Sequence, residues 1–325
     1  MIKNSAALTA ALGSGLVGAT SLSAAHPTAA FAGTQTDALT GTQQVTHPVV
    51  RRGRINQGLV TWTYMAFGAN WSLEKLCQVA VDLGCSAIDL AGPDDWPTIH
   101  RYGLQCSLSV NGMPDPPYAK GLNNPRYQPE VIARTKQRIE ECAAAGVPSV
   151  IAFTGYKYRD NDHPGRGEFT LEEGADNTVS GLKELALHAE RHGITICVEH
   201  LNSRVEGDDF RGHPPYQGDD IDYCADIIRR VGSSHVKLLF DIYHVQIMNG
   251  DVIARIREYG TDLIGHIHTA GVPGRVELDT DQELNYPAIM RALLEIGYTG
   301  YVGQEFLPTR DPIGGLSAAV ALCDV

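Results

Sequence analysis

From residue 58 onward, short apolar runs rich in β-branched residues alternate with longer stretches of helical periodicity. This alternation predicts parallel strands joined by crossover helices. The expected strands cover residues 58–64, 87–91, 104–110, 149–155, 195–201, 236–243, 263–269 and 301–306. Eight such units match the usual size of a closed (β/α)₈ TIM barrel, so we predict one barrel of the α/β class. An open doubly wound sheet is the alternative, but its usual Gly-rich turn after the first strand is missing.

Several of the predicted helices carry recognisable end signals. Ser72 and Asp220 each precede a helical pattern, and Thr170 does so with Glu173 three residues later. Glycine, which accepts the left-handed backbone of a helix end, follows five of the patterns. These glycines are Gly84, Gly103, Gly146, Gly193 and Gly297.

Two connections are longer than the 2–6 residues typical of strand-to-helix loops. They run over residues 156–169 and 202–218, and both follow the carboxyl end of a strand. Barrel active sites are built at that end. We therefore expect both segments to cover a substrate.

The first fifty residues differ from the rest of the chain. Lys3 precedes an apolar run over residues 6–22, and the small-residue pattern Ala30-Phe31-Ala32 follows it. This order is typical of an export signal, so we expect residues 1–32 to be a signal peptide, with the mature protein periplasmic or extracellular. A retained membrane anchor is the alternative, but the run is short and diluted with Gly, Ser and Thr. Residues 33–55 lack periodicity and are expected to be a flexible leader to a catalytic domain over residues 56–325.

Charge and cysteine content exclude some classes of protein. The net charge is −12, and no basic cluster lies in the predicted domain, which argues against a nucleic-acid partner. The seven cysteines are an odd number and lie mostly inside apolar patterns. They resemble small core residues more than a disulfide framework.

Four ionisable residues stand at the carboxyl ends of consecutive late strands: Glu199, Asp241, His268 and Glu305. In a closed barrel these strand ends surround one axis, so the four side chains can converge. A carboxylate that follows an apolar strand is costly to bury unless it is paired or bound to a metal. For any one of them an ion pair or a helix cap is a sufficient explanation, but four in corresponding places favour a shared site. Three oxygen donors and one nitrogen donor suit one divalent ion: Mn²⁺, Mg²⁺, Co²⁺ or Zn²⁺.

The sequence around these residues resembles the hydroxypyruvate isomerase-like branch of the sugar phosphate isomerase/epimerase superfamily, whose fold is the xylose isomerase-like TIM barrel. The resemblance covers residues 56–325. Its most specific stretches are Val198-Glu199-His200-Leu201-Asn202, Phe240-Asp241-Ile242-Tyr243-His244, Gly265-His266-Ile267-His268-Thr269 and Gly303-Gln304-Glu305-Phe306.

This resemblance implies roles for individual residues. Glu199, Asp241, His268 and Glu305 would be the metal ligands, and Glu199 and Glu305 would also be the catalytic acid and base. His244 and Arg275 would bind substrate oxygens. The position after the first glutamate is commonly Pro in the family, whereas this chain has His200, which puts the identity of the substrate in doubt.

Four further residues have weaker interpretations. His200 and Asn202 lie beside Glu199 and are candidates for substrate binding. His266 shares the inward face of its strand with His268, which suggests that it supports the site or packs beneath it. Trp62 is placed near a strand end, where it could form a wall over the substrate, although core packing is the favoured explanation.

The leading hypothesis is an isomerase of a small hydroxy-carbonyl compound, such as hydroxypyruvate and tartronate semialdehyde. A divalent ion would stabilise the enediolate charge that develops when a carboxylate removes a proton beside a carbonyl. A ketose 3-epimerase, a lyase acting on oxidised (3-oxo) sugars or glycosides, and a non-catalytic sugar-binding barrel are the alternatives. The expected partner is a small keto acid or sugar. Members of this family often form homo-oligomers, but the sequence shows no self-complementary patch.

Overall fold

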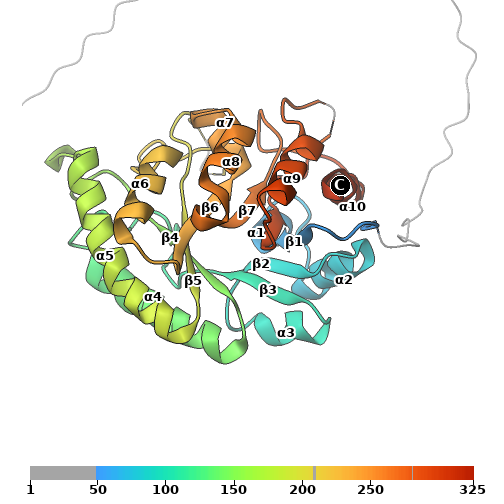
Figure 1. The fold of residues 1–325 in the computed structure, drawn as a ribbon, viewed down its shortest axis with the longest axis horizontal. Helices are drawn as coiled ribbons and strands as arrows, with labels where there is room; N and C mark the ends of the chain where they lie inside the picture. The colour runs from blue at the N-terminus through green and yellow to red at the C-terminus, as the bar shows by residue number, and fades with distance from the viewer. Residues whose placement is uncertain (1–48, 208–209, 280) are drawn as a thin grey trace, which may run out of the picture. The chain divides into compact units, whose positions relative to one another are not determined.

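The computed structural model describes residues 49–207, 210–279 and 281–325. In this part of the chain eight parallel strands pair in sequence order, and β8 pairs with β1 to close a barrel (Figure 1). The strands are β1 (Asn56–Val60), β2 (Ala87–Ala91), β3 (Gln105–Ser109), β4 (Ser149–Phe153), β5 (Thr195–Glu199), β6 (Val236–Asp241), β7 (Ile264–Thr269) and β8 (Tyr301–Gln304). The predicted (β/α)₈ barrel is therefore confirmed.

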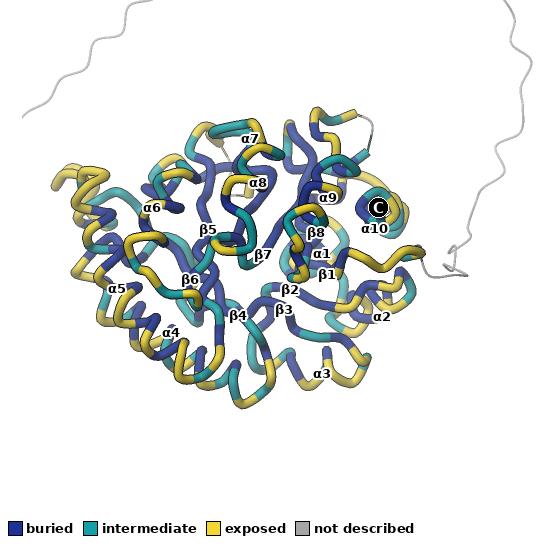
Figure 2. Tube along the Cα trace, viewed as in Figure 1, coloured by how far each residue is buried: buried dark blue, intermediate teal, exposed yellow. Residues whose placement is uncertain are grey.

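Helices surround the barrel (Figure 1). They are α1 (Thr61–Met65), α2 (Leu73–Leu83), α3 (Trp96–Arg101), α4 (Gln128–Ala145), α5 (Leu171–His192), α6 (Ile221–Val231), α7 (Ile242–Met248), α8 (Val252–Leu263), α9 (Tyr286–Glu295) and α10 (Pro312–Cys323), with a short 3₁₀ helix, η1 (Pro164–Arg166). Figure 2 shows the strands buried and the outward faces of the helices exposed. Apolar residues between the strands and this helical layer make the main core.

The predicted caps are present. The Ser72 side chain accepts a hydrogen bond from the backbone N–H of Lys75, and Asp220 caps α6 in the same way. The Thr170 side chain accepts from the backbone N–H of Glu173, and the Glu173 side chain accepts from that of Thr170, which completes a capping box. The glycines after α2, α4 and α5 adopt the left-handed conformation, as expected.

Six predicted strands run past the observed strand ends. The two expected at residues 58–64 and 236–243 end at Val60 and Asp241, and a short helix follows each of them at once. At the second site the Asp241 side chain caps α7 by accepting from the backbone N–H groups of Tyr243 and His244. The apolar pattern alone cannot reveal such a cap, because Ile242 and Tyr243 suit a strand as well as a buried helix.

The N-terminal segment is anchored from residue 49. The backbone N–H groups of Val49 and Val50 donate to the carbonyl of Leu83, and those of residues 51–53 donate to the Asp324 carboxylate. Residues 49–53, the described start of the expected leader, are thus hydrogen-bonded to the barrel. The predicted signal peptide and the rest of the leader lie outside the described residues. Among the residues that are described, no helix has the length and apolar character needed to cross a membrane.

The two long connections after β4 and β5 pair with each other. Tyr156 and Tyr216 form an antiparallel bridge, and the backbone N–H of Lys157 donates to the carbonyl of Pro215. The Gln217 side chain joins both segments by donating to the carbonyl of Phe169, and it also accepts from Asn123 before α4. The described parts of the two segments thus lie against each other at the carboxyl ends of β4 and β5.

Candidate metal and substrate site

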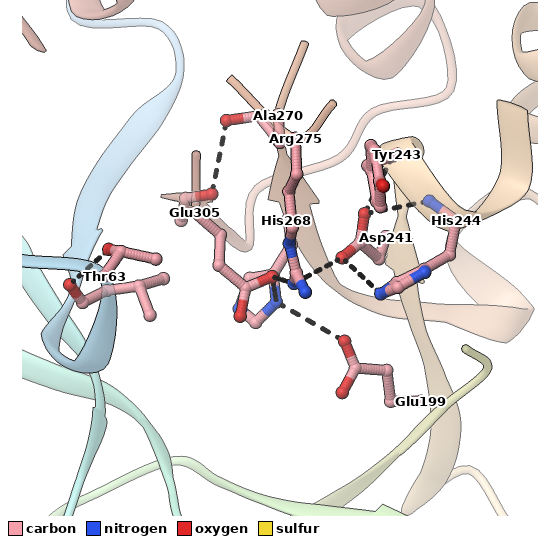
Figure 3. A network of polar contacts seen from close by, with 12 residues as sticks. Thr63, Glu199, Asp241, Tyr243, His244, His268, Ala270, Arg275 and Glu305 are labelled. Atoms are coloured by element: carbon pink, nitrogen blue, oxygen red, sulfur yellow. Dashed lines mark hydrogen bonds and ion pairs between the residues drawn. The ribbon is translucent and has the colours of Figure 1, made fainter. Parts of the chain in front are cut away.

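Four side chains converge at the carboxyl ends of four strands, as the sequence predicts. Glu199 comes from β5, Asp241 from β6, His268 from β7 and Glu305 from the residue after β8 (Figure 3). One ligand atom from each lies within 4.8 Å of those from the others, and all four residues are buried. Their donor atoms are therefore close enough to share one cation.

Asp241 uses its two carboxylate oxygens for different purposes. Oδ1 accepts hydrogen bonds from the backbone N–H groups of Tyr243 and His244, at 2.8 and 3.3 Å. Oδ2 faces the cluster, 3.4 Å from Nη2 of Arg275. The helix cap fixes the carboxylate and leaves one oxygen turned toward the site.

Glu305 is held in a similar way. Its Oε1 accepts a 2.9 Å hydrogen bond from the indole N–H of Trp62, and its Oε2 lies 2.5 Å from Nη2 of Arg275 and 3.1 Å from Nδ1 of His268. Trp62, for which the sequence favoured core packing, thus orients one of the predicted bases.

The carboxylates differ in their pKa shifts. Burial raises the pKa of Asp241 to about 8, and the charge of Glu305 adds to the rise. Burial and the charge of Glu305 also raise the pKa of Glu199. Burial alone would raise the pKa of Glu305, but the charges of Arg275 and His268 hold it well below its ordinary value. Two buried acids therefore favour protonation while a third stays ionised.

The donor set fits a divalent cation. Glu199 Oε1 is buried without a hydrogen-bond partner among the described residues, 3.8 Å from Nδ1 of His268. Three carboxylates in one buried cluster need positive charge to offset their repulsion and desolvation. In the structure the Arg275 guanidinium supplies this charge, between Asp241 and Glu305. Carboxylate oxygens with one imidazole nitrogen are ligands suited to Mn²⁺, Mg²⁺, Co²⁺ or Zn²⁺.

Arg275 is rigidly placed in the site. Its backbone has a φ of +58°, a left-handed conformation that non-glycine residues rarely adopt and that costs about 1–3 kcal/mol. Its guanidinium carbon lies 5.1 Å from the ring centre of Trp62 and 5.5 Å from that of Tyr243. Nη1 donates to the carbonyl of Phe210. The sequence predicted Arg275 as a substrate ligand, and the structure brings it to the same point as the four clustered side chains.

His244 presents one ring nitrogen to the site. Nδ1 accepts hydrogen bonds from the backbone and side-chain N–H groups of Asn202, so the proton of the neutral ring lies on Nε2. Nε2 lies 3.6 Å from Asp241 Oδ2 and has no hydrogen-bond partner within the described ranges. Burial and the charge of Arg275 lower the pKa of His244 well below its ordinary value, which keeps the ring neutral.

The two weaker candidates beside Glu199 occupy different positions. The Asn202 side chain is engaged within the protein, since Nδ2 also donates to the carbonyl of Arg211 and Oδ1 accepts from Val205. His200 is fully buried, with its ring centre 6.1 Å from that of His244. Burial lowers the pKa of His200 to about 3. Asn202 therefore orients His244, and neutral His200 packs behind it.

One acidic residue of the site was not predicted. Asp89 of β2 is fully buried, and its Oδ2 lies 2.6 Å from Nε2 of His266 and 3.3 Å from Nε2 of His268. Burial alone would raise the pKa of Asp89, but the charge and hydrogen bond of His266, followed by those of His268, hold it below its ordinary value. The sequence offered one signal for Asp89: it is the only acidic residue in the apolar pattern of residues 87–91. His266 proves to support His268 through this carboxylate, in line with its predicted role.

A second histidine group lies on the outer helices. Glu140 of α4 and His188 and His192 of α5 bring potential ligand atoms together. Arg191 lies 3.1 Å from Nδ1 of His188, and a guanidinium can only donate, so the proton of that ring is on Nε2, which faces Glu140 at 3.1 Å. This arrangement is a polar contact between two helices, and it leaves no lone pair of His188 for a metal ion.

Known proteins resemble this chain over different spans. A zebrafish (Danio rerio) protein provisionally named hydroxypyruvate isomerase is 36% identical over 141 residues, which are 43% of this chain and 49% of that protein. The chain thus spans about half the length of that relative. A 2-oxo-tetronate isomerase of Pectobacterium atrosepticum is 27% identical over 250 residues, covering 73% of this chain and 88% of the relative.

Solved structures share the fold. A crystal structure of a family 2 AP endonuclease from Brucella melitensis superposes with a TM-score of 0.67 and 22% sequence identity, covering 81% of this chain and 96% of the other. The family model described as xylose isomerase-like TIM barrel matches residues 78–321. That span is most of the chain and includes all four clustered side chains. The chain therefore belongs to the xylose isomerase-like TIM barrel family.

Proposed function

We propose that this protein is a divalent-metal-dependent isomerase of a small hydroxy-carbonyl acid, of the hydroxypyruvate and tartronate semialdehyde kind. The observation that carries the proposal is the convergence of Glu199, Asp241, His268 and Glu305 at the barrel mouth. The names of the relatives, hydroxypyruvate isomerase and 2-oxo-tetronate isomerase, support a small keto acid as the substrate class.

The four converging side chains would hold the cation. A divalent ion bound there would polarise the carbonyl oxygen and stabilise negative charge on the neighbouring oxygen, which makes the carbon-bound hydrogen more acidic. The buried position of the cluster excludes bulk water, so the charges within it interact strongly.

Glu305 and Glu199 suit opposite proton-transfer roles. Glu305 is held ionised by Arg275 and His268, so it can remove a proton from the carbon that bears the hydroxyl group. Glu199 has a raised pKa, so it accepts a transferred proton more readily than Glu305 does. Environments that push two carboxyl pKa values apart are typical of an acid and base pair. Return of this proton to the adjacent carbon, together with transfer of the hydroxyl proton to the former carbonyl oxygen, completes the isomerisation.

Arg275 and His244 would position the substrate. The guanidinium offers several donors to a carboxylate, and a charge-assisted pair of this kind favours an acid over a neutral sugar. His244 offers one N–H from Nε2, because Asn202 occupies Nδ1. These two donors would hold substrate oxygens in a fixed orientation beside Glu305.

A ketose 3-epimerase is the second candidate. One observation favours it: Glu199 and Glu305 come from β5 and β8, two strands that are not neighbours in the barrel. Two carboxylates on opposite sides of a substrate can remove a proton from one face and return one to the other. Epimerisation inverts a single carbon, whereas isomerisation moves the carbonyl group, so the products distinguish the two.

Proton NMR in D₂O tests the proposal. Protein loaded with Mg²⁺ is incubated with hydroxypyruvate, with a four-carbon keto acid and with ketoses, and a chelator-treated sample is the control. We expect exchange at the hydroxymethyl carbon of hydroxypyruvate together with formation of the aldehyde, and loss of both with the chelator. Exchange at carbon 3 of a ketose alone would establish the epimerase, and no exchange with any compound would refute both.

We also propose that residues 1–32 direct export, with the barrel working in the periplasm or outside the cell. The support is the sequence pattern of Lys3, the apolar run and Ala30-Phe31-Ala32. N-terminal sequencing of the protein from its natural source should then begin near residue 33. A protein that retains the first 32 residues would contradict cleavage.

A further inference from the structure

Asp89 occupies an unusual place in the barrel wall. The pairing of β2 with β3 shifts register on both sides of Asp89, and the next residue, Leu90, has a φ of +55°. An irregularity of this kind re-aims a side chain, and a left-handed non-glycine residue is costly, at about 1–3 kcal/mol. Here the Asp89 side chain is fully buried and reaches two histidines of β7.

The neighbouring strand leaves room for this contact. A Cβ atom on Gly303 of β8 would lie 2.3 Å from Oδ2 of Asp89 and 3.0 Å from Cδ2 of His268. Any larger residue would therefore push these two side chains apart. Three strands, β2, β7 and β8, are thus fitted around a single carboxylate oxygen.

The contact fixes Nε2 of His268 as a hydrogen-bond donor. An ionised carboxylate only accepts hydrogen bonds, so Nε2 of His268 donates to Oδ2 of Asp89 at 3.3 Å. The opposite nitrogen, Nδ1, lies 3.1 Å from Glu305 and 3.8 Å from Glu199. With Nε2 held as the donor to Asp89, Nδ1 is the nitrogen that faces the carboxylates and that a cation bound among them would use.

We propose that Asp89 is a positioning residue, which fixes His268 with Nε2 protonated and Nδ1 free to bind the cation. The inference rests on the proposed function, because it needs a cation at the cluster. His266 holds the same oxygen at 2.6 Å and keeps the carboxylate from rotating away from His268. Carboxylates that accept from the second nitrogen of a metal-binding histidine orient the ring and make it a better ligand.

Titration with Mn²⁺ tests the inference without any measurement of activity. In Asp89→Asn the amide can donate to Nε2, which favours the tautomer with its proton on Nδ1. We expect Mn²⁺ affinity to fall by about 10–100-fold, the range measured for other such partners. Asp160→Asn is the matched control, because Asp160 is also a buried aspartate but pairs with Arg126 and Arg166 away from the cluster. It should bind Mn²⁺ as the parent does.

A second measurement needs no variant. In the Zn²⁺-loaded parent labelled with ¹⁵N-histidine, the His268 ring should show a proton on Nε2 and a metal shift on Nδ1. A proton on Nδ1, or parental Mn²⁺ affinity in Asp89→Asn, would overturn the role of Asp89 and leave the proposed function standing. If the parent binds neither Mn²⁺ nor Zn²⁺ at the cluster, the proposed function fails, and this inference fails with it.

Discussion

Nη2 of Arg275 lies 2.5 Å from Oε2 of Glu305, and both side chains are buried. The guanidinium therefore supplies positive charge at the place where the sequence predicts a metal ion. The same pairing keeps Glu305 ionised, since the charge of Arg275 lowers its pKa. Arg275 thus offsets the negative charge of the carboxylate cluster and is also placed to bind an acidic substrate.

Removing this arginine should affect substrate binding more than cation binding. In Arg275→Gln we expect KM for hydroxypyruvate to rise by about 10–100-fold, because a charge-assisted hydrogen bond is worth about 1.5–3 kcal/mol. Mn²⁺ affinity should not fall, since the carboxylates lose a competing positive charge. Steady-state kinetics and calorimetric titration measure the two effects. Arg275→Lys keeps the charge without the planar fork, so its KM should lie between those of the parent and Arg275→Gln. An unchanged KM in Arg275→Gln would exclude a substrate role.

Replacing the two predicted acid and base groups should abolish proton transfer. Glu305→Gln and Glu199→Gln are each expected to lower kcat by about 10²–10⁴-fold at saturating Mn²⁺, the usual contribution of a positioned proton-transfer group. Glu277→Gln is a suitable control, because Glu277 is a buried glutamate that bonds Thr309 outside the cluster. Its kcat should stay within a few-fold of the parent. A parental kcat in either of the first two variants would remove that residue from the mechanism.

Cation binding should become stronger as the pH rises. The pKa of Asp241 is raised to about 8 and that of Glu199 is also raised, so both favour protonation near neutrality. A cation requires the ionised forms, and its binding must expel these protons. Below pH 8 the affinity for Mn²⁺ should therefore fall by roughly tenfold per pH unit for each proton released. Calorimetry between pH 6 and 8.5 measures this slope, and a constant affinity between pH 6 and 8 would show that the carboxyl groups are already ionised.

A helix cap remote from the cluster offers a test of the fold alone. Asp220 accepts from the backbone N–H groups of Asp222 and Tyr223 at the start of α6. Asp220→Ala should lower the free energy of unfolding by about 1 kcal/mol without changing Mn²⁺ affinity. Asp220→Asn retains an acceptor and should stay close to the parent in urea denaturation. Equal stability of the Ala variant and the parent would mean that this cap contributes little.

The sequence was sufficient to predict the barrel and the four converging side chains. Each of these residues follows an apolar strand, and the carboxyl ends of parallel strands in a closed barrel meet at one mouth. The ends of β1 and β6 were placed too late, because a helix begins immediately after each strand and its first residues are also apolar. Nothing in a strand pattern distinguishes Asp241 as the last strand residue and first helix cap.

Asp89 could not be predicted because its contacts are remote in the chain. Its partners lie 177 and 179 residues further on, across β8 and β1. The backbone irregularity at Leu90 that turns it inward leaves no trace in hydrophobic periodicity. The orientation of His244 by Asn202 was missed for the same reason, because the two residues become neighbours only when β5 and β6 pair.

Anomalous diffraction from crystals soaked in Mn²⁺ tests the central claim most directly. The account predicts one strong peak bound by carboxylate oxygens of Glu199, Asp241 and Glu305 and by Nδ1 of His268, with Arg275 displaced from Glu305. A saturated crystal with no peak at this cluster, or with Mn²⁺ bound elsewhere in its place, would contradict it.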